Sequence, residues 1–111
     1  MEFKTSEENG ISTVVLVGNL DTASAGPAEA ELMKLIEGNA NQLLLDFTDV
    51  PFIASSGLRV LLKIGQALQA NGGKLHICCI NDTVREVFEI SGFDRIFSVF
   101  DSKQDARSDL D

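Results

Sequence analysis

Two neighbouring stretches of this chain decide its fold: LLLDF at residues 43–47 and FIASSGLRVLL at residues 52–62. The first is a short, continuous apolar run, which is typical of a strand buried on both faces in a parallel sheet. A loop with Pro51 follows it, and apolar residues then recur at helical spacing from about residue 56 to residue 70. Together the two stretches predict a buried strand, a loop and an amphipathic helix.

The residues before this unit predict a hairpin and a first helix. Residues 11–17 (ISTVVLV) are rich in β-branched side chains and favour a strand, with which residues 3–7 can pair through a turn at Asn9-Gly10. A loop follows, and Pro27 suits the first position of a helix. Helically spaced apolar residues continue to Gly38, which predicts the end of that helix.

The residues after the unit predict another strand and another helix. Residues 71–73 (NGG) end the central helix, and residues 74–80 favour a strand. Residues 81–83 (NDT) are expected to open a third helix, in which Thr83 and Glu86 have the spacing of a capping box. Gly92 is the expected stop of that helix.

The C-terminal part completes the predicted fold. Residues 96–100 predict a short edge strand, and residues 101–111 predict a weak or mobile helix or tail, with Ala106 and Leu110 facing inward. Strands and helices alternate along the chain after the leading hairpin. This order predicts an α/β fold in one domain over residues 1–111, with a mixed sheet that is mostly parallel and packs against helices.

The composition excludes several classes of partner. The 111 residues fit one domain, and their formal net charge is −8. Binding to nucleic acid or to an anionic membrane needs a positive surface, so neither is expected. The chain has no apolar run long enough for a membrane-spanning helix and no signal-peptide pattern at its N-terminus, which predicts a cytoplasmic protein. Its acidity either keeps it soluble or steers a basic partner.

No catalytic chemistry is indicated by the residue types and their spacing. The one histidine, His76, lies inside a predicted strand, and no nucleophile-elbow, phosphate-loop or dinucleotide-binding motif occurs. Ligand-type residues are not clustered in the sequence, so no metal site and no cofactor are expected. In a strand, Cys78 and Cys79 would point to opposite faces, which predicts buried reduced thiols. We therefore expect a protein that is not an enzyme.

Ser55, Ser56 and Gly57 stand where a loop meets the first turn of the central helix. One interpretation is structural: a serine caps the free N–H groups of that turn, and Gly57 makes room for a close neighbour. The other interpretation is that one serine is a phosphoacceptor. The helix dipole and the unpaired N–H groups would tolerate a phosphate there, which would add charge to a docking surface without unfolding the protein.

The same stretches resemble the STAS-domain family of anti-sigma factor antagonists, which act in the partner switching of sporulation and stress responses. That family typically has Asp-Ser-Ser-Gly-Leu or Asp-Ser-Thr-Gly-Leu where this chain has ASSGL at residues 54–58. Gly18-x-Leu20-Asp21 matches the family's loop after the second strand, and residues 84–94 (VREVFEISGFD) match its third helix and the stop that follows. The resemblance covers almost the full length of the chain.

The resemblance implies a switch controlled by phosphorylation. In that family the first serine of the pair, here Ser55, is phosphorylated by an anti-sigma factor that is also a serine kinase, and a serine phosphatase reverses the change. The unphosphorylated antagonist, usually a monomer when free, binds the anti-sigma factor, which then releases its sigma factor. The partner-binding residues that the resemblance implies are Asp21, Thr22, Ser56, Gly57, Leu58 and Arg59.

Ala54 departs from the family pattern, because an acidic residue usually precedes the phosphoacceptor serine. The missing carboxylate removes either a contact to the kinase or a repulsion of the phosphate. It also favours a second hypothesis, in which the domain is a scaffold or subunit of a signalling or transport assembly and is not phosphorylated. A third hypothesis, a nucleotide or small-ligand binder, has no phosphate loop to support it.

Overall fold

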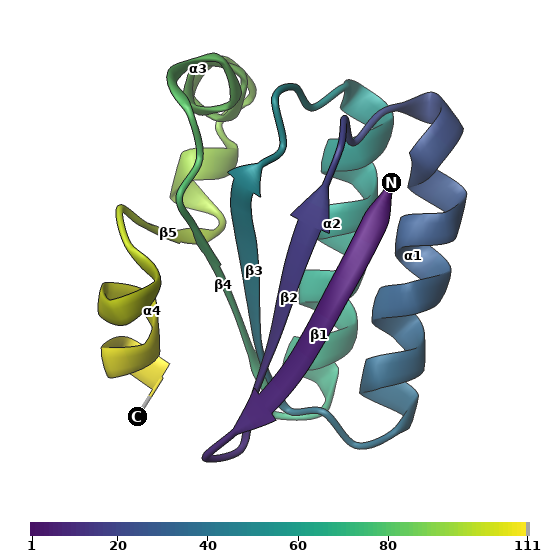
Figure 1. Ribbon diagram of the computed structural model, residues 1–111, viewed down its shortest axis with the longest axis vertical. Helices are drawn as coiled ribbons and strands as arrows, with labels where there is room; N and C mark the ends of the chain where they lie inside the picture. Colours follow the sequence, from purple (N-terminus) through teal and green to yellow (C-terminus); the bar gives the residue numbers. More distant parts are fainter. Residues whose placement is uncertain (111) are drawn as a thin grey trace.

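The computed structural model describes residues 1–110 and contains a five-stranded sheet in chain order, β1-β2-β3-β4-β5 (Figure 1). β1 pairs with β2 antiparallel, and the other neighbouring strands are parallel. This confirms the predicted α/β fold with a mixed, mostly parallel sheet that starts with a hairpin. The elements are β1 (Glu2–Glu8), β2 (Ile11–Val17), α1 (Thr22–Glu37), β3 (Gln42–Asp49), α2 (Ser55–Ala70), β4 (Lys74–Cys78), α3 (Asp82–Ser91), the 3₁₀ turn η1 (Phe93–Arg95), β5 (Ser98–Phe100) and α4 (Lys103–Leu110).

The hairpin between β1 and β2 turns at Asn9 and Gly10, as the sequence predicts. Both residues have positive φ angles, 55° and 78°, which is the backbone shape of the tight turns that match strand twist. Glu8 and Ile11, the residues on either side, are paired directly across the ladder. The turn therefore sets the register of the only antiparallel pair in the described sheet.

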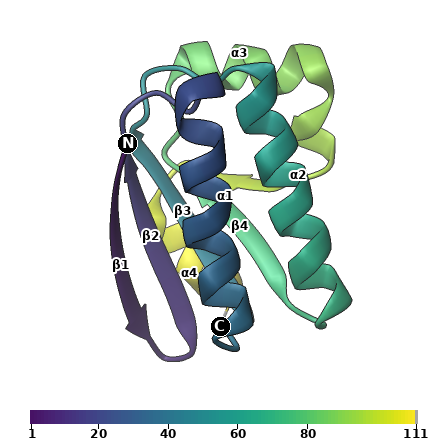
Figure 2. The same ribbon diagram turned by 90° about the vertical axis from the view of Figure 1, so that its right-hand side faces the viewer.

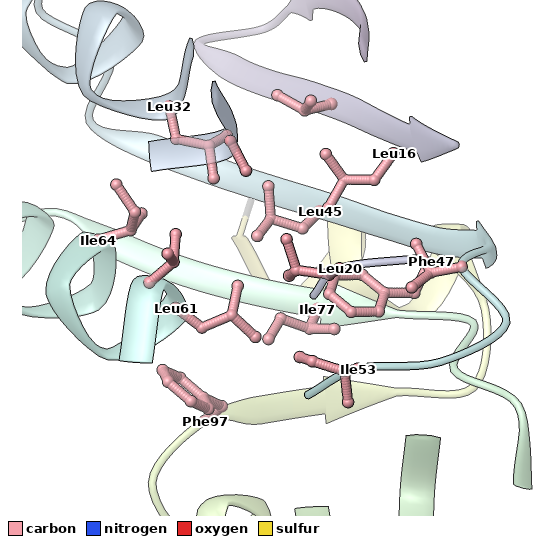
Figure 3. Close-up of a cluster of buried hydrophobic side chains, with 14 of the residues drawn as sticks. Leu16, Leu20, Leu32, Leu45, Phe47, Ile53, Leu61, Ile64, Ile77 and Phe97 are labelled. Atoms are coloured by element: carbon pink, nitrogen blue, oxygen red, sulfur yellow. The ribbon is translucent and has the colours of Figure 1, made fainter. Parts of the chain in front are cut away.

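Helices α1 and α2 cover one face of the sheet, and the main core lies between them and the strands (Figure 2). Leu16 of β2 and Leu45 of β3 point to this face, where Leu32 of α1 and Leu61 of α2 meet them (Figure 3). All four side chains are almost fully buried. Removal of this apolar layer from water drives the packing that holds α2 in place.

Helix α1 begins before Pro27, so the start predicted from the proline was wrong. Asp21 is the N-cap: its Oδ1 accepts hydrogen bonds from the backbone N–H groups of Ala23 and Ser24 at 3.1 and 3.2 Å. In return the Ser24 hydroxyl oxygen accepts from the Asp21 N–H at 3.0 Å, which completes a capping box. Pro27 lies inside the helix, and Gly26 before it has no Cβ to meet the proline ring.

Helix α3 is capped by Asn81 and not by Thr83, the predicted cap. The Asn81 side-chain oxygen accepts from the Val84 N–H at 2.8 Å, and its amide nitrogen donates to the Pro51 carbonyl oxygen at 3.1 Å. An asparagine one position before the helix thus both caps α3 and holds the loop after β3. The helix ends as predicted at Gly92, whose φ of 77° is left-handed.

Helix α4 packs on the opposite face of the sheet from α1 and α2 (Figure 1). Ala106 and Leu110 are buried there, which confirms the inward-facing pair predicted for the tail. Asp111, the last residue of that predicted tail, lies outside the described residues. Across residues 1–110, no helix has the length and apolar character needed to cross a lipid bilayer.

Two charged contacts fix α4 to the strands beneath it. Lys103 Nζ lies 3.1 Å from Asp46 Oδ2, and Asp109 Oδ2 lies 2.6 Å from Nε2 of His76, whose side chain is buried. Burial by itself would raise the pKa of Asp46. Hydrogen bonds from the Thr48 hydroxyl and backbone N–H, together with the Lys103 ammonium, outweigh burial and hold that pKa below its ordinary value.

Asp46→Asn is expected to make the free energy of unfolding depend less on pH in the acidic range. A carboxyl group whose pKa is lowered by folding stabilises the native state above its ordinary pKa, and this contribution is lost as the pH falls through the lowered value. The measurement is the free energy of unfolding in urea as a function of pH. Lys103→Met, which removes one of the stabilising partners, should show part of the same reduction in pH dependence; parallel curves for all three proteins would contradict the assignment.

Candidate functional site

The loops after β2 and β3 lie next to each other at the carboxyl ends of these strands (Figure 1). The Leu20 N–H donates to the Phe52 carbonyl oxygen at 3.0 Å, and the Ala54 N–H donates to the Leu20 carbonyl oxygen at 2.9 Å. The two segments that the family resemblance implied, 18–22 and 52–59, are therefore brought together. We call them the two-loop surface.

Gly57 determines how closely α2 approaches the first of these loops. A Cβ atom at this position would lie 2.7 Å from both the carbonyl oxygen and the Cγ atom of Leu20, and 2.9 Å from Ile53 Cγ1. Favourable contacts between such atoms need about 3.5–4.0 Å, so only glycine fits without displacing a neighbour. This agrees with the structural interpretation of Gly57, and the close neighbour is the backbone and side chain of Leu20.

Ser55 is the first residue of α2, and its side chain is exposed. The N-cap is Ala54, whose backbone is extended (φ −97°, ψ 172°) and which offers no side-chain hydrogen bond to the first turn. The interpretation in which Ser55 or Ser56 caps the helix was therefore wrong. N–H groups of a first turn have no partner within the helix, so this uncapped turn and the helix dipole favour an anion beside Ser55.

Thr22 and Ser56 connect the starts of α1 and α2. Their hydroxyl oxygens are 3.3 Å apart, close enough for a hydrogen bond in either direction. Asp21, next to Thr22, is half-buried and uses its carboxylate to cap α1. Of the predicted pair, Thr22 at the start of α1 is thus exposed, and Asp21 fixes the shape of the loop before it.

Arg59 and Leu58 have different environments although they are adjacent. Arg59 is exposed one helical turn after Ser55, which places the two on the same side of α2. Leu58 is only 6% exposed and belongs to the main core, and Gly57 is buried as well. Leu58 and Gly57 therefore support the two-loop surface from beneath, while Thr22, Ser55 and Arg59 face solvent.

Phe52 is a member of the two-loop surface that the sequence pattern did not indicate. Its side chain is 42% exposed, whereas the other phenylalanines of the chain are buried or half-buried. A phenylalanine directly after Pro51, in a loop between a predicted strand and a predicted helix, is the signal that could have indicated it. An exposed aromatic ring three residues before Ser55 provides the apolar contact area that protein partners use.

Asp46, Cys78 and Cys79 come together on the face of the sheet beneath α4, although the sequence predicted no cluster of ligand-type residues. Asp46 and Cys78 are direct neighbours across the parallel pair β3 and β4, and one ligand atom from each of the three residues lies within 4.8 Å of the others. The predicted opposite placement of the two cysteines was wrong. The strand ends at Cys78, and a φ of 68° at Cys79 turns the chain so that the two sulfur atoms lie 2.9 Å apart.

Comparison with known proteins identifies the family to which this chain is similar. The family model of the STAS domain matches residues 2–106. BtrV of Bordetella bronchiseptica, which is named as an anti-sigma factor antagonist, is 36% identical over 106 residues. That match covers 96% of this chain and 91% of BtrV.

Solved structures share the fold at low sequence identity. A structure from Thermotoga maritima, described as that of an anti-sigma factor antagonist, has a TM-score of 0.93 at 20% identity and covers 97% of this chain and 93% of its own. The phosphorylated form of SpoIIAA, a cell fate determinant of Bacillus, has a TM-score of 0.76 at 21% identity and covers 99% of this chain and 100% of its own. At these identities the likeness concerns the fold alone.

Gly57→Ala is expected to destabilise the protein by about 1–3 kcal/mol, because the new methyl group overpacks against Leu20. Gly65→Ala is the matched control, since it lies in the same helix and gains the same helix propensity. A Cβ at Gly65 would meet the Phe97 ring at 3.3 Å, a milder contact. Urea unfolding of both variants checks the difference, and equal stabilities would refute the role given to Leu20.

Proposed function

Because the chain belongs to the STAS domain family, we propose that it is an anti-sigma factor antagonist that works as a phosphorylation switch. In its unphosphorylated form it binds an anti-sigma factor of the serine-kinase type, which then releases a sigma factor. Phosphorylation of Ser55 switches this binding off, and a serine phosphatase restores it. In this scheme the protein performs no catalysis, acts in the cytoplasm and is a monomer when free.

The observation that carries the proposal is the exposed Ser55 hydroxyl at a helix start without a side-chain cap. A kinase can reach this hydroxyl without unfolding any part of the domain. A phosphate placed there would lie at the positive end of the α2 dipole, near N–H groups that need acceptors. Arg59, one turn further along the same side, offers a guanidinium group for a charge-assisted hydrogen bond.

The two-loop surface also supports an explanation of how the phosphate would release the partner. The surface combines an exposed Phe52 ring with the small polar side chains of Thr22, Ser55 and Ser56. A partner that covers this area would have to bury about −1.5 to −2 charges if Ser55 carried a phosphate. An unpaired charge in an interface is strongly unfavourable, so binding would be lost while the fold is kept.

Ala54 is the observation that favours a second function, a scaffold or assembly subunit that is never phosphorylated. Its methyl group stands at the N-cap, where an acidic side chain would both cap α2 and meet a kinase. A scaffold of this kind would use the same surface or another one, but its binding would not depend on the charge at Ser55. The two functions therefore differ in whether a negative charge at Ser55 weakens binding of the partner.

The first test is co-expression of the chain with kinase-type anti-sigma factors from its own genome, followed by intact-mass measurement and peptide mapping. We expect one phosphate, on Ser55. Ser55→Ala should then bind the anti-sigma factor constitutively. Ser55→Asp should weaken binding by at least about thirtyfold, because an uncompensated buried charge costs about 2–5 kcal/mol.

Gln66→Glu is the control for charge, because it adds a negative side chain at an exposed position of the same helix, away from the two-loop surface. It should bind like the parent chain. A complex that forms without phosphate, and that Ser55→Asp does not weaken, would favour the scaffold. Phosphate on Ser56 in place of Ser55 would refute the assignment of the acceptor.

A further inference from the structure

Cys78 and Cys79 form a close pair of thiols on the face of the sheet opposite the two long helices. The sulfur atoms are 2.9 Å apart, and both cysteines are free. Cys79 holds a left-handed backbone, with a φ of 68°, which non-glycine residues seldom adopt. Its N–H donates to the Phe100 carbonyl oxygen at 3.0 Å, so β5 fixes this conformation. A strained residue held by its surroundings in this way points to a function.

Asp46 contributes a carboxylate to the same place. It lies beside Cys78 across the parallel strands, and the ligand atoms of the three residues are within 4.8 Å of one another. The Thr48 N–H and hydroxyl donate to Asp46 Oδ1 at 2.9 and 2.6 Å, which orients the carboxylate. The other oxygen, Oδ2, lies 3.1 Å from the Lys103 ammonium, and a carboxylate oxygen with one such partner keeps a free lone pair.

We propose that Cys78, Cys79 and Asp46 form a binding site for a thiophilic divalent cation, with Zn²⁺ as the first candidate. Two sulfur ligands and one oxygen ligand are a donor set that Zn²⁺ accepts, and a water molecule would take the fourth tetrahedral position. With Zn–S bonds of about 2.3 Å, the two sulfurs would lie about 3.8 Å apart. The present 2.9 Å must therefore widen, which rotation of the half-exposed Cys79 side chain can provide.

The charges around the site suit a divalent ion. Two thiolates and one carboxylate carry three negative charges, and a divalent cation together with the Lys103 ammonium balances them. Lys103 is itself 41% exposed, so its flexible stem can shift while the ammonium stays near Asp46. The half-exposed Cys79 gives the ion a route past the buried Cys78.

Proton release is the main cost of binding at this site. Burial, followed by the hydrogen bond with Cys79 and the nearby Asp46 carboxylate, raises the pKa of the Cys78 thiol far above its ordinary value, and the Lys103 ammonium opposes this shift. The thiols must lose their protons to bind an ion. An ion held by these three residues would join β3 to β4 under the start of α4.

The test uses the full chain, reduced and freed of metal, with Zn²⁺ alone as the ligand in competition with a chromophoric chelator. We expect one Zn²⁺ per chain. Cd²⁺ should give the ultraviolet charge-transfer absorption of a thiolate complex, and Zn²⁺ should raise the melting temperature because it binds the folded chain. A chain that removes no Zn²⁺ from the chelator, or one ion shared by two chains, would overturn the proposal.

Variants separate this site from unspecific binding at acidic groups. Cys79→Ser should weaken binding by more than about a hundredfold, since even the outer-shell partners of a zinc site change affinity by about 10- to 100-fold. Asp46→Asn should weaken it by at least about tenfold. Asp109→Asn is the control, because it alters another carboxylate between α4 and the sheet without touching the ligand set. Equal affinity in all three variants would refute the site, and circular dichroism shows whether each variant is folded.

Discussion

The close approach of α2 to Leu20, which Gly57 permits, is the constraint on which the rest of this structure depends. Leu20 exchanges backbone hydrogen bonds with the loop after β3, and its side chain fills the space beneath the first turn of α2. The first turn of α2 can therefore lie directly against the loop after β2 while the rest of the helix packs over the sheet. The same approach brings Thr22 within reach of Ser56, so that two loops from different parts of the chain form one surface.

The two faces of the sheet carry different kinds of site. The face under α1 and α2 is a continuous apolar core, and polar groups near it gather at the carboxyl ends of the strands, where Ser55 is exposed. The face under α4 is only partly apolar, and buried polar groups such as His76 and Asp46 find their partners on the short helix. A partner at the two-loop surface and a cation beneath α4 would thus occupy separate regions of one small domain.

Much of the fold could be predicted because its signals are local. The Asn9-Gly10 turn, the apolar run of β3 and the stop at Gly92 each depend on the backbone preferences of a few consecutive residues. The helix starts were misplaced where two local signals competed. Pro27 is a good first residue of a helix, but the capping box at Asp21 begins α1 earlier.

The sequence by itself determined the order of strands and helices, the inward pair Ala106 and Leu110, and the position of Ser55 at a helix start. Those properties follow from the spacing of apolar residues and from the turn-forming residues within short segments of the chain. Only the tertiary structure decided that Leu20 lies against Gly57 and that Asp46 lies beside Cys78. Crossover helices bring parallel strands together from distant parts of the chain, and the register of these strands sets which residues become neighbours. No local sequence pattern contains that register.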